Sequence, residues 1–228
     1  MDHSDLVKEH FEKEYDYYDE LIQKLIPKYN VMHFVAVNAI DFDPQKNIKF
    51  LDLGIGTGKT SETLLNGFPN ARVHGIDLAL KMLEQAKINL NEFGDRITFE
   101  ESDMIKLNGF EKYDGCIGIL SIHHLTDDQK SDLFKKVFTT LNKGGIFVIG
   151  DIIKFDTEKG THEKEQKWKK FLVRGLGEEK GNFWFKNYLE EDIPSSISQQ
   201  VKWLKEAGFE AECIWEYMNY AVIKAVKN

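Results

Sequence analysis

The sequence has little cysteine, little proline and no long apolar run. Its 228 residues include only Cys116, Cys213 and four prolines. Two thiols inside apparent strands are typical of reduced, buried side chains, not of the disulfide framework of a small secreted domain. No stretch approaches the ~18 apolar residues of a membrane span, and the acidic N-terminus lacks the apolar segment of a secretory signal. We therefore expect a cytoplasmic protein without a membrane partner.

The sequence also lacks a concentration of basic charge. The formal net charge is −8, and residues 1–20 alone hold eight acids and two lysines, which contribute −6. The remainder is near neutral and has no basic stripe of the kind that binds a phosphate backbone. Nucleic acid is therefore disfavoured as a partner, and a small molecule is expected instead. The oligomeric state stays open, with a homodimer among the alternatives.

The most informative segment that is present is a glycine-rich turn. Residues 50–58 read Phe-Leu-Asp-Leu-Gly-Ile-Gly-Thr-Gly, so an apolar strand ends in an acid and glycine then recurs at every second position. Without side chains, the backbone can turn sharply and a ligand can lie against it. Residues 59–65 are predicted to form a helix. In an open α/β sheet, ligands bind at such a junction of strand and helix.

Three motifs compete for this turn. A dinucleotide site, Gly-x-Gly-x-x-Gly, needs a third glycine where Lys59 stands. A phosphate-binding P-loop would end in Gly58-Lys59-Thr60, but its first glycine is replaced by Leu53. The pattern acid-x-Gly-x-Gly-x-Gly fits every position from Asp52 to Gly58. On this motif the chain resembles the class I S-adenosylmethionine-dependent methyltransferases. The alternative is a turn that only packs a helix on the sheet, but such a turn would need one glycine and not three.

The order of predicted elements indicates an α/β fold. Strands expected at 48–53, 72–76, 97–100, 113–120 and 146–151 alternate with helices, which predicts a doubly wound, mostly parallel sheet. A helix at 198–207 then precedes a hairpin of strands 210–217 and 219–226. The resemblance implies a seven-stranded Rossmann-like sheet with an antiparallel final strand. We expect a single domain, divided into a helical lid (1–44), a cofactor-binding core (45–153), a helical substrate insert after strand five (154–197), and a C-terminal helix and hairpin (198–228).

The resemblance implies S-adenosylmethionine as the cofactor, held by the glycine turn and two acids. Gly54, Gly56 and Gly58 would lie under its amino-acid and ribose parts, and Asp52 would face its ammonium group through water or a backbone amide. Asp77 follows the second strand. A carboxylate accepts two hydrogen bonds at once, so Asp77 suits the ribose diol. The alternative is a solvated acid at a strand end.

The remaining cofactor contacts are implied by position in the family pattern. Asp103 would approach the adenine amino group, or would instead cap a helix. Met104 would pack on the adenine ring, and Leu78 would cover its other face or belong to the core. Leu120 ends the fourth strand, whose terminal carbonyls would approach the ammonium group. Tyr18 resembles part of a lid that excludes water, or belongs to an acidic amphipathic helix docked by its aromatic residues.

His123 and His124 are the candidate catalytic residues. Neutral imidazole can accept a proton near neutral pH, which matters when the methyl acceptor must lose one. Adjacent side chains usually point in different directions, so we expect one histidine to face the acceptor and the other to be structural. Both being structural is the alternative. A metal site at these histidines, with His162 and Glu163 as further ligands, is another alternative. Adjacent histidines chelate poorly and no ligand spacing appears, so we expect no metal.

The expected insert contributes candidate acceptor-binding residues. Only three arginines occur among thirty basic residues, and Arg174 is the one that lies in this insert. Its guanidinium would clamp a carboxylate of the acceptor, or would be an ordinary surface charge. Trp168 and Trp184 would line an aromatic or apolar pocket, or would fill the core of a helical subdomain.

These inferences predict a methyltransferase that acts on a small-molecule acceptor by in-line displacement. Three alternatives remain open. The chain also resembles, less closely, enzymes of the tRNA wobble-uridine pathway, including the one that makes carboxy-S-adenosylmethionine. A nucleotide hydrolase would use Gly58-Lys59-Thr60 with residues 147–151 as a magnesium-binding strand. A non-catalytic cofactor-binding protein would bind S-adenosylhomocysteine without transferring a methyl group.

Overall fold

A computed structural model describes residue 8, residues 18–107 and residues 111–228, with Tyr18 and Asp19 described by their backbone alone. The first half of the chain alternates helices and strands: α2 (Tyr18–Leu25), α3 (Tyr29–Asn38), β1 (Lys49–Leu53), α4 (Lys59–Gly67), β2 (Arg72–Asp77), α5 (Leu80–Asn89), η2 (Asn91–Arg96), β3 (Ile97–Glu101), η3 (Met104–Lys106) and β4 (Tyr113–Ile119). The second half contains η4 (Ile122–His124), α6 (Asp127–Thr140), β5 (Leu141–Lys154), α7 (Glu158–Leu176), α8 (Glu178–Glu191), β6 (Ser195–Ser196), α9 (Ile197–Ala207), β7 (Glu210–Tyr217) and β8 (Tyr220–Val226).

The sheet has the predicted topology. Its main path runs β3-β2-β1-β4-β5-β8-β7, and β8 is antiparallel to both of its neighbours. The strands from β3 to β5 pair in parallel. The α/β fold with seven principal strands and an antiparallel final strand is therefore confirmed. The short β6, which pairs with β5, was not predicted, because two serines carry no hydrophobic pattern.

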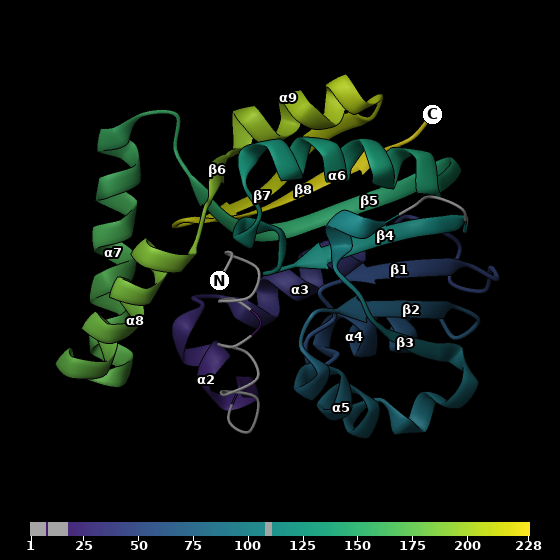
Figure 1. The fold of residues 1–228 in the computed structure, drawn as a ribbon, viewed down its shortest axis with the longest axis horizontal. Coiled ribbons are helices and arrows are strands. Elements are labelled where there is room, and N and C mark those ends of the chain that lie inside the picture. Colours follow the sequence, from purple (N-terminus) through teal and green to yellow (C-terminus); the bar gives the residue numbers. More distant parts are fainter. Residues whose placement is uncertain (1–7, 9–17, 108–110) are drawn as a thin grey trace.

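Two hydrophobic clusters, one on each face of the sheet, hold the helices in place. The first cluster includes Met32 of α3, Leu64 of α4 and Leu83 of α5. The second joins α6 and α9 through buried residues such as Phe134 and Leu204. Figure 1 shows α6 and α9 together on one side of the sheet and α3 and α4 on the other. This covering of both faces explains why the central strands are almost continuously apolar.

The helices after β5 form a separate pair at one end of the sheet. In Figure 1, α7 and α8 stand side by side next to α2. The indole N–H of Trp168 in α7 donates to the Leu25 carbonyl at 2.8 Å, which ties α7 to the end of α2. The predicted helical insert after the fifth strand is thus present. The strand itself runs from Leu141, earlier than the expected start at residue 146.

Other boundaries differ from the predictions by a few residues. Within the helical lid expected over residues 1–44, the described residues form α2 and α3. The helix expected between the second and third strands ends at Asn89 and is followed by the 3-10 helix η2. Both cysteines have free thiols. None of the helices among the described residues is long and apolar enough to cross a membrane.

Candidate active site

A cavity of about 590 Å³ opens where the central parallel strands end. It is lined by the β1–α4 turn, the residues that follow β2 and β3, and the residues between β4 and α6. The strands β2 and β4 lie on opposite sides of β1. Connections leave such a central strand toward opposite edges of the sheet, which opens a crevice for a ligand. The topology therefore predicts a binding site at this place.

The glycine turn forms the floor of this cavity. Gly54, Gly56 and Gly58 all have positive φ angles, of 71°, 55° and 93°, a region that side chains disfavour. A Cβ at Gly54 would lie 2.5 Å from Cβ of Ser121, and one at Gly58 would lie 2.5 Å from Leu90. Gly54 and Gly56 line the cavity, while Gly58 packs against Leu90. A Cβ at Gly56 would meet nothing within 4 Å, so the backbone here is open to a ligand.

Asp77 joins the end of β2 to the glycine turn. Its Oδ2 accepts a hydrogen bond from the Gly56 amide at 2.8 Å, and its Oδ1 accepts one from the Ala79 amide at 2.9 Å. The residue also lines the cavity. Because each carboxylate oxygen has a further lone pair, Asp77 can hold the turn and still accept hydrogen bonds from a diol.

The other predicted contacts with adenine and the ammonium group also line the cavity. Asp103 accepts a hydrogen bond from the Ile105 amide at 3.0 Å, so it caps η3 and faces the cavity at once. Met104, Leu78 and Leu120 supply apolar wall. The side chain of Tyr18 lies outside the described residues.

Asp52 lies beneath the turn, away from the cavity. Its side chain is 1% exposed and accepts a hydrogen bond from the Ser61 hydroxyl at 2.6 Å. Burial raises the pKa of the Asp52 carboxyl to about 7, with Ser61 lowering it and Asp77 raising it. Asp52 is not among the described residues that line the cavity. Its predicted position facing the cofactor needs correction, because β1 is central and α4 covers this side chain.

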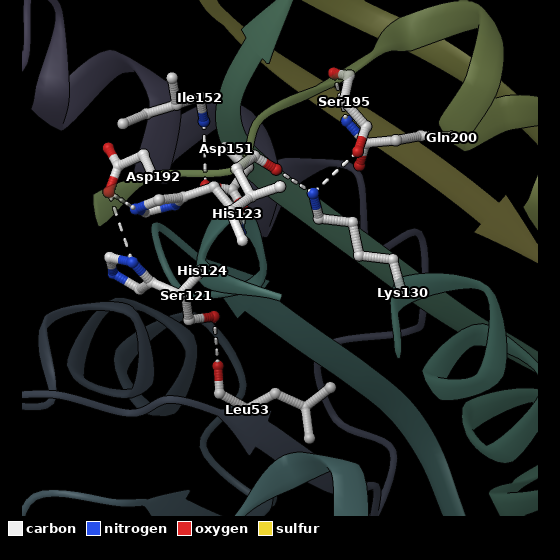
Figure 2. A network of polar contacts seen from close by, with 11 residues as sticks. Leu53, Ser121, His123, His124, Lys130, Asp151, Ile152, Asp192, Ser195 and Gln200 are labelled. Carbon is white, nitrogen blue, oxygen red and sulfur yellow. Dashed lines mark hydrogen bonds and ion pairs between the residues drawn. The ribbon is translucent and has the colours of Figure 1, made fainter. Parts of the chain in front are cut away.

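The two histidines lie side by side and share a carboxylate. Figure 2 shows the Asp192 carboxylate to one side of both imidazole rings, joined to each by a dashed line, with Asp151 on the far side of His123. Nε2 of His123 lies 3.6 Å and Nδ1 of His124 lies 3.4 Å from the same oxygen, Oδ1 of Asp192. His124 lines the cavity, whereas His123 is buried behind it. Burial opposes a charge on His123, but Asp151 and Asp192 outweigh it and raise the pKa of the imidazole.

A buried lysine stabilises the segment that carries Asp192. Nζ of Lys130 in α6 donates to the Ser195 hydroxyl at 2.7 Å and to the Ile193 carbonyl. The Ile193 amide in turn donates to the His123 carbonyl at 2.9 Å. Burial lowers the pKa of Lys130 to about 8, against the raising effect of Asp151 and Asp127. The chain entering α9 is therefore held against the histidines by polar contacts.

His33 lines the cavity and was not predicted. It lies on α3, is 5% exposed, and its Nδ1 is 3.0 Å from the Thr60 hydroxyl. Burial and then Lys59 lower the pKa of this imidazole to about 4, so the ring is neutral at pH 7. A single histidine in an apolar helix carries no sequence pattern that points to a site. Asp192 was also missed, because it lies 68 residues from His124 in sequence and no local pattern connects the two.

The residues predicted to bind the acceptor lie elsewhere. Trp168 is 4% exposed and packs against Phe185 and Tyr188. Trp184 is half-buried beside Phe183. Arg174 is exposed in the last turn of α7.

None of these three predicted acceptor contacts is among the described residues that line the cavity. Nor does His162, exposed on α7, join the His123–His124 pair. The tryptophans pack the helices of the insert against each other, so the expected acceptor contacts are corrected to structural and surface roles.

The chain is similar to methyltransferases and to a related class of synthases. Residues 50–145 match the family model described as a methyltransferase domain. The carboxy-S-adenosyl-L-methionine synthase of Campylobacter lari is 23% identical over 98% of this chain and 99% of its own length. An uncharacterized methyltransferase of Bacillus cytotoxicus is 34% identical over 47% of this chain and 49% of its own length.

Solved structures share the fold at low sequence identity. Magnesium protoporphyrin IX methyltransferase of Synechocystis with bound S-adenosylmethionine has a TM-score of 0.66 and 16% identity, over 100% of this chain and 98% of that one. Human N-acetylserotonin methyltransferase has a TM-score of 0.61 and 19% identity over 88% of this chain. The chain spans about half the length of that human protein, or 52%.

The cavity fits the cofactor that these methyltransferases use. The open backbone at Gly56, the carboxylate of Asp77 and the apolar side chains around Met104 match an amino-acid head, a ribose diol and an adenine ring. All of them lie within the segment matched by the family model. Residues 50–145 are therefore similar to a methyltransferase domain, and the cavity that they largely build has the groups that S-adenosylmethionine needs.

Proposed function

We propose that this protein transfers the methyl group of S-adenosylmethionine to a small-molecule acceptor that reaches the cavity beside His124. The proposal rests on a single observation: groups that suit the cofactor and further polar groups for an acceptor line the same cavity. The glycine turn and Asp77 suit the cofactor, and His33 and His124 add polar atoms that the cofactor does not require. A volume of about 590 Å³ lies in the range of small-molecule sites.

Positioning is the main chemical task of this site. Bound S-adenosylmethionine supplies a methyl group on a positively charged sulfur, which makes it reactive toward a nucleophile. Holding the acceptor in line with that methyl group can supply much of the rate enhancement. In this proposal Asp77 and the glycine turn orient the cofactor, and His124 orients or activates the acceptor. His33 stays neutral, so it adds a hydrogen-bonding group without repelling the charged sulfur.

The division of the chain into functional segments is part of the proposal. Residues 1–44 are proposed to form a lid, which is supported by Lys8, Tyr29 and His33 at the cavity wall. Residues 154–197 are proposed to border the acceptor side through Asp192 beside the histidines. Exclusion of water by such segments would favour transfer to the acceptor over side reactions.

Formation of carboxy-S-adenosylmethionine is the second candidate function. It is supported by the similarity over nearly the full chain to a synthase with that name. Lys8, Lys59 and Lys106 line the cavity and offer positive charge for a carboxylated ligand. Mass spectrometry of the ligand released from the purified protein would separate the candidates. Plain S-adenosylmethionine or S-adenosylhomocysteine favours methyl transfer, and the carboxylated form favours the synthase.

Isothermal titration with S-adenosylhomocysteine tests the cofactor site. We expect micromolar binding by the native chain and at least about tenfold weaker binding by Asp77→Ala, which is about 1.4 kcal/mol. Asp95→Ala is the matched control, because Asp95 has a side chain that is 83% exposed and it lies outside the cavity lining. Equal binding by native protein and Asp77→Ala would remove Asp77 from the site.

A further inference from the structure

We propose that His123, His124 and Asp192 form a binding site for a divalent transition-metal ion at the acceptor end of the cavity. Three side chains from two separate segments each direct a ligand atom to one place, and these atoms all lie within 4.8 Å of one another. Cation binding itself stands on this geometry alone. The use of the cation in methyl transfer rests on the proposed function.

The spacing of the donor atoms suits coordination. In tetrahedral geometry with bonds near 2.0–2.1 Å, two ligand atoms lie about 3.3 Å apart. The two nitrogen–oxygen distances to Asp192 are 3.6 Å and 3.4 Å. Small side-chain rotations would bring such a group onto one ion. The two histidine rings lie close together, with centroids 4.0 Å apart and planes tilted by 47°, and each ring directs one nitrogen toward the same carboxylate oxygen.

The hydrogen-bond network fixes His123 in the form that binds metals. Its Nδ1 lies in hydrogen-bond contact with Oδ1 of Asp151, and a carboxylate can only accept, so Nδ1 carries the hydrogen. The Asp151 carboxylate is itself held by the amides of His123 and Ile152, at 2.8 Å and 2.9 Å. A carboxylate behind a ligating histidine is the usual outer support of a metal site, since it orients the ring and raises its basicity.

The second ring nitrogen of His123, Nε2, faces the negatively charged side chain of Asp192. With its hydrogen on Nδ1, a neutral ring presents the Nε2 lone pair to Asp192, whose side chain is only 11% exposed. Two electron-rich atoms in a buried place repel each other unless a cation lies between them. A metal ion would be held by His123, His124 and Asp192 together, in place of a proton shared between His123 and Asp192. Two imidazoles and a carboxylate suit zinc or ferrous iron.

The site would keep open positions toward the cavity. Three protein ligands leave at least one coordination position free, which is the pattern of catalytic sites. His124 lines the cavity, so that position faces the space proposed for the acceptor. Metal binding lowers the pKa of a coordinated hydroxyl or thiol. The acceptor class that follows is a small molecule with an ionisable oxygen or sulfur.

Cobalt(II) provides the direct test, because its visible spectrum reports nitrogen and oxygen ligands without requiring activity. The full chain is freed of metal with a chelator and titrated with Co²⁺ and, by calorimetry, with Zn²⁺. We expect one equivalent to bind and to give visible absorption bands. Asp192→Asn and His124→Asn should each bind at least about tenfold more weakly, and Asp151→Asn about tenfold more weakly. His162→Asn, at an exposed histidine of α7, is the matched control and should bind as the native chain does.

The outcomes separate this proposal from the proposed function. S-adenosylhomocysteine binding is measured on the same preparations, and it also shows that each variant is folded. A native chain that binds S-adenosylhomocysteine but gives no cobalt bands overturns the metal site alone. Equal cobalt binding by native protein and by whichever of Asp192→Asn and His124→Asn is folded overturns it as well. A native chain that binds cobalt but no S-adenosylhomocysteine supports the metal site and contradicts the cofactor assignment.

Discussion

The buried carboxyl group of Asp52 links the stability of this protein to pH. Its pKa is raised from 3.8 to about 7 because the side chain is buried under the glycine turn. The folded chain therefore keeps a proton in a pH range where the unfolded chain has released it. Stability contributed by this group is present at low pH and is lost as the pH rises from about 4 to about 7.

The Asp52→Asn substitution tests this linkage. Between about pH 5 and about pH 8, the native chain should lose on the order of 2 kcal/mol of unfolding free energy relative to the variant. Urea unfolding of both ligand-free proteins at the two pH values measures the difference. Asp95→Asn, at an exposed acid, should follow the native chain. Parallel pH dependence of native protein and Asp52→Asn would contradict the role assigned to Asp52.

The position of some site residues could be predicted from the sequence, and that of others could not. Asp77 and Asp103 follow strands, and strand ends of a parallel sheet meet at one edge, so their position at the cavity could be predicted. Asp52 lies in the same motif but inside the strand, where neighbouring elements decide what its side chain meets. Asp192 could not be predicted, because contacts between distant segments bring it to the histidines: Lys130 binds the Ile193–Ser195 segment, and the Ile193 amide donates to the His123 carbonyl.

At the scale of elements, the contact between α7 and α8 depends on one glycine. A Cβ at Gly181 would lie 2.6 Å from the backbone nitrogen and 2.7 Å from Cα of Val173. Backbone atoms cannot give way as a flexible side chain can. The two helices therefore pack closely only because residue 181 has no side chain.

Gly181→Ala should push α7 and α8 apart. We expect the free energy of unfolding to fall by about 1–3 kcal/mol, because overpacking outweighs the gain of up to about 1 kcal/mol in helix propensity. Gly67→Ala is the matched control, since Gly67 also lies in a helix and a Cβ there meets nothing within 4 Å. Thermal or urea unfolding of the native chain, Gly181→Ala and Gly67→Ala measures the change in stability. No loss of stability in Gly181→Ala would show that the helix pair can shift freely.

The sequence predicted the helices and strands better than it predicted which side chains pack against each other. Strands and helices of the core were expected nearly in place, since alternating apolar runs and glycine breaks are local features. The tryptophans of α7 and α8 illustrate the limit. Trp168 packs with Tyr188 and bonds to Leu25, which lies 143 residues away. A large aromatic side chain looks the same in a sequence whether it fills a core or lines a pocket.

At the scale of the whole molecule, cofactor binding should stabilise the fold. A ligand that binds only the folded chain adds about 2.7 kcal/mol at about 100 times its Kd. For a chain of 228 residues, this corresponds to a rise in Tm on the order of 5–10 °C. S-adenosylhomocysteine should produce this rise in a thermal melt, and ATP with magnesium should not. The reverse result would favour the nucleotide hydrolase suggested by Gly58-Lys59-Thr60.

The sequence by itself determined the fold class and the edge of the sheet where the cavity lies. Periodicity and the spacing of glycines and acids depend on neighbours along the chain, so they can be read without coordinates. Only the tertiary structure decided which side chains meet at the cavity: it placed His33 in the cavity wall and Asp192 beside the histidines, and it turned Asp52, Trp168 and Arg174 away. Side-chain partners from distant segments are set by how the helices pack on the sheet, and that packing leaves no local pattern in the sequence.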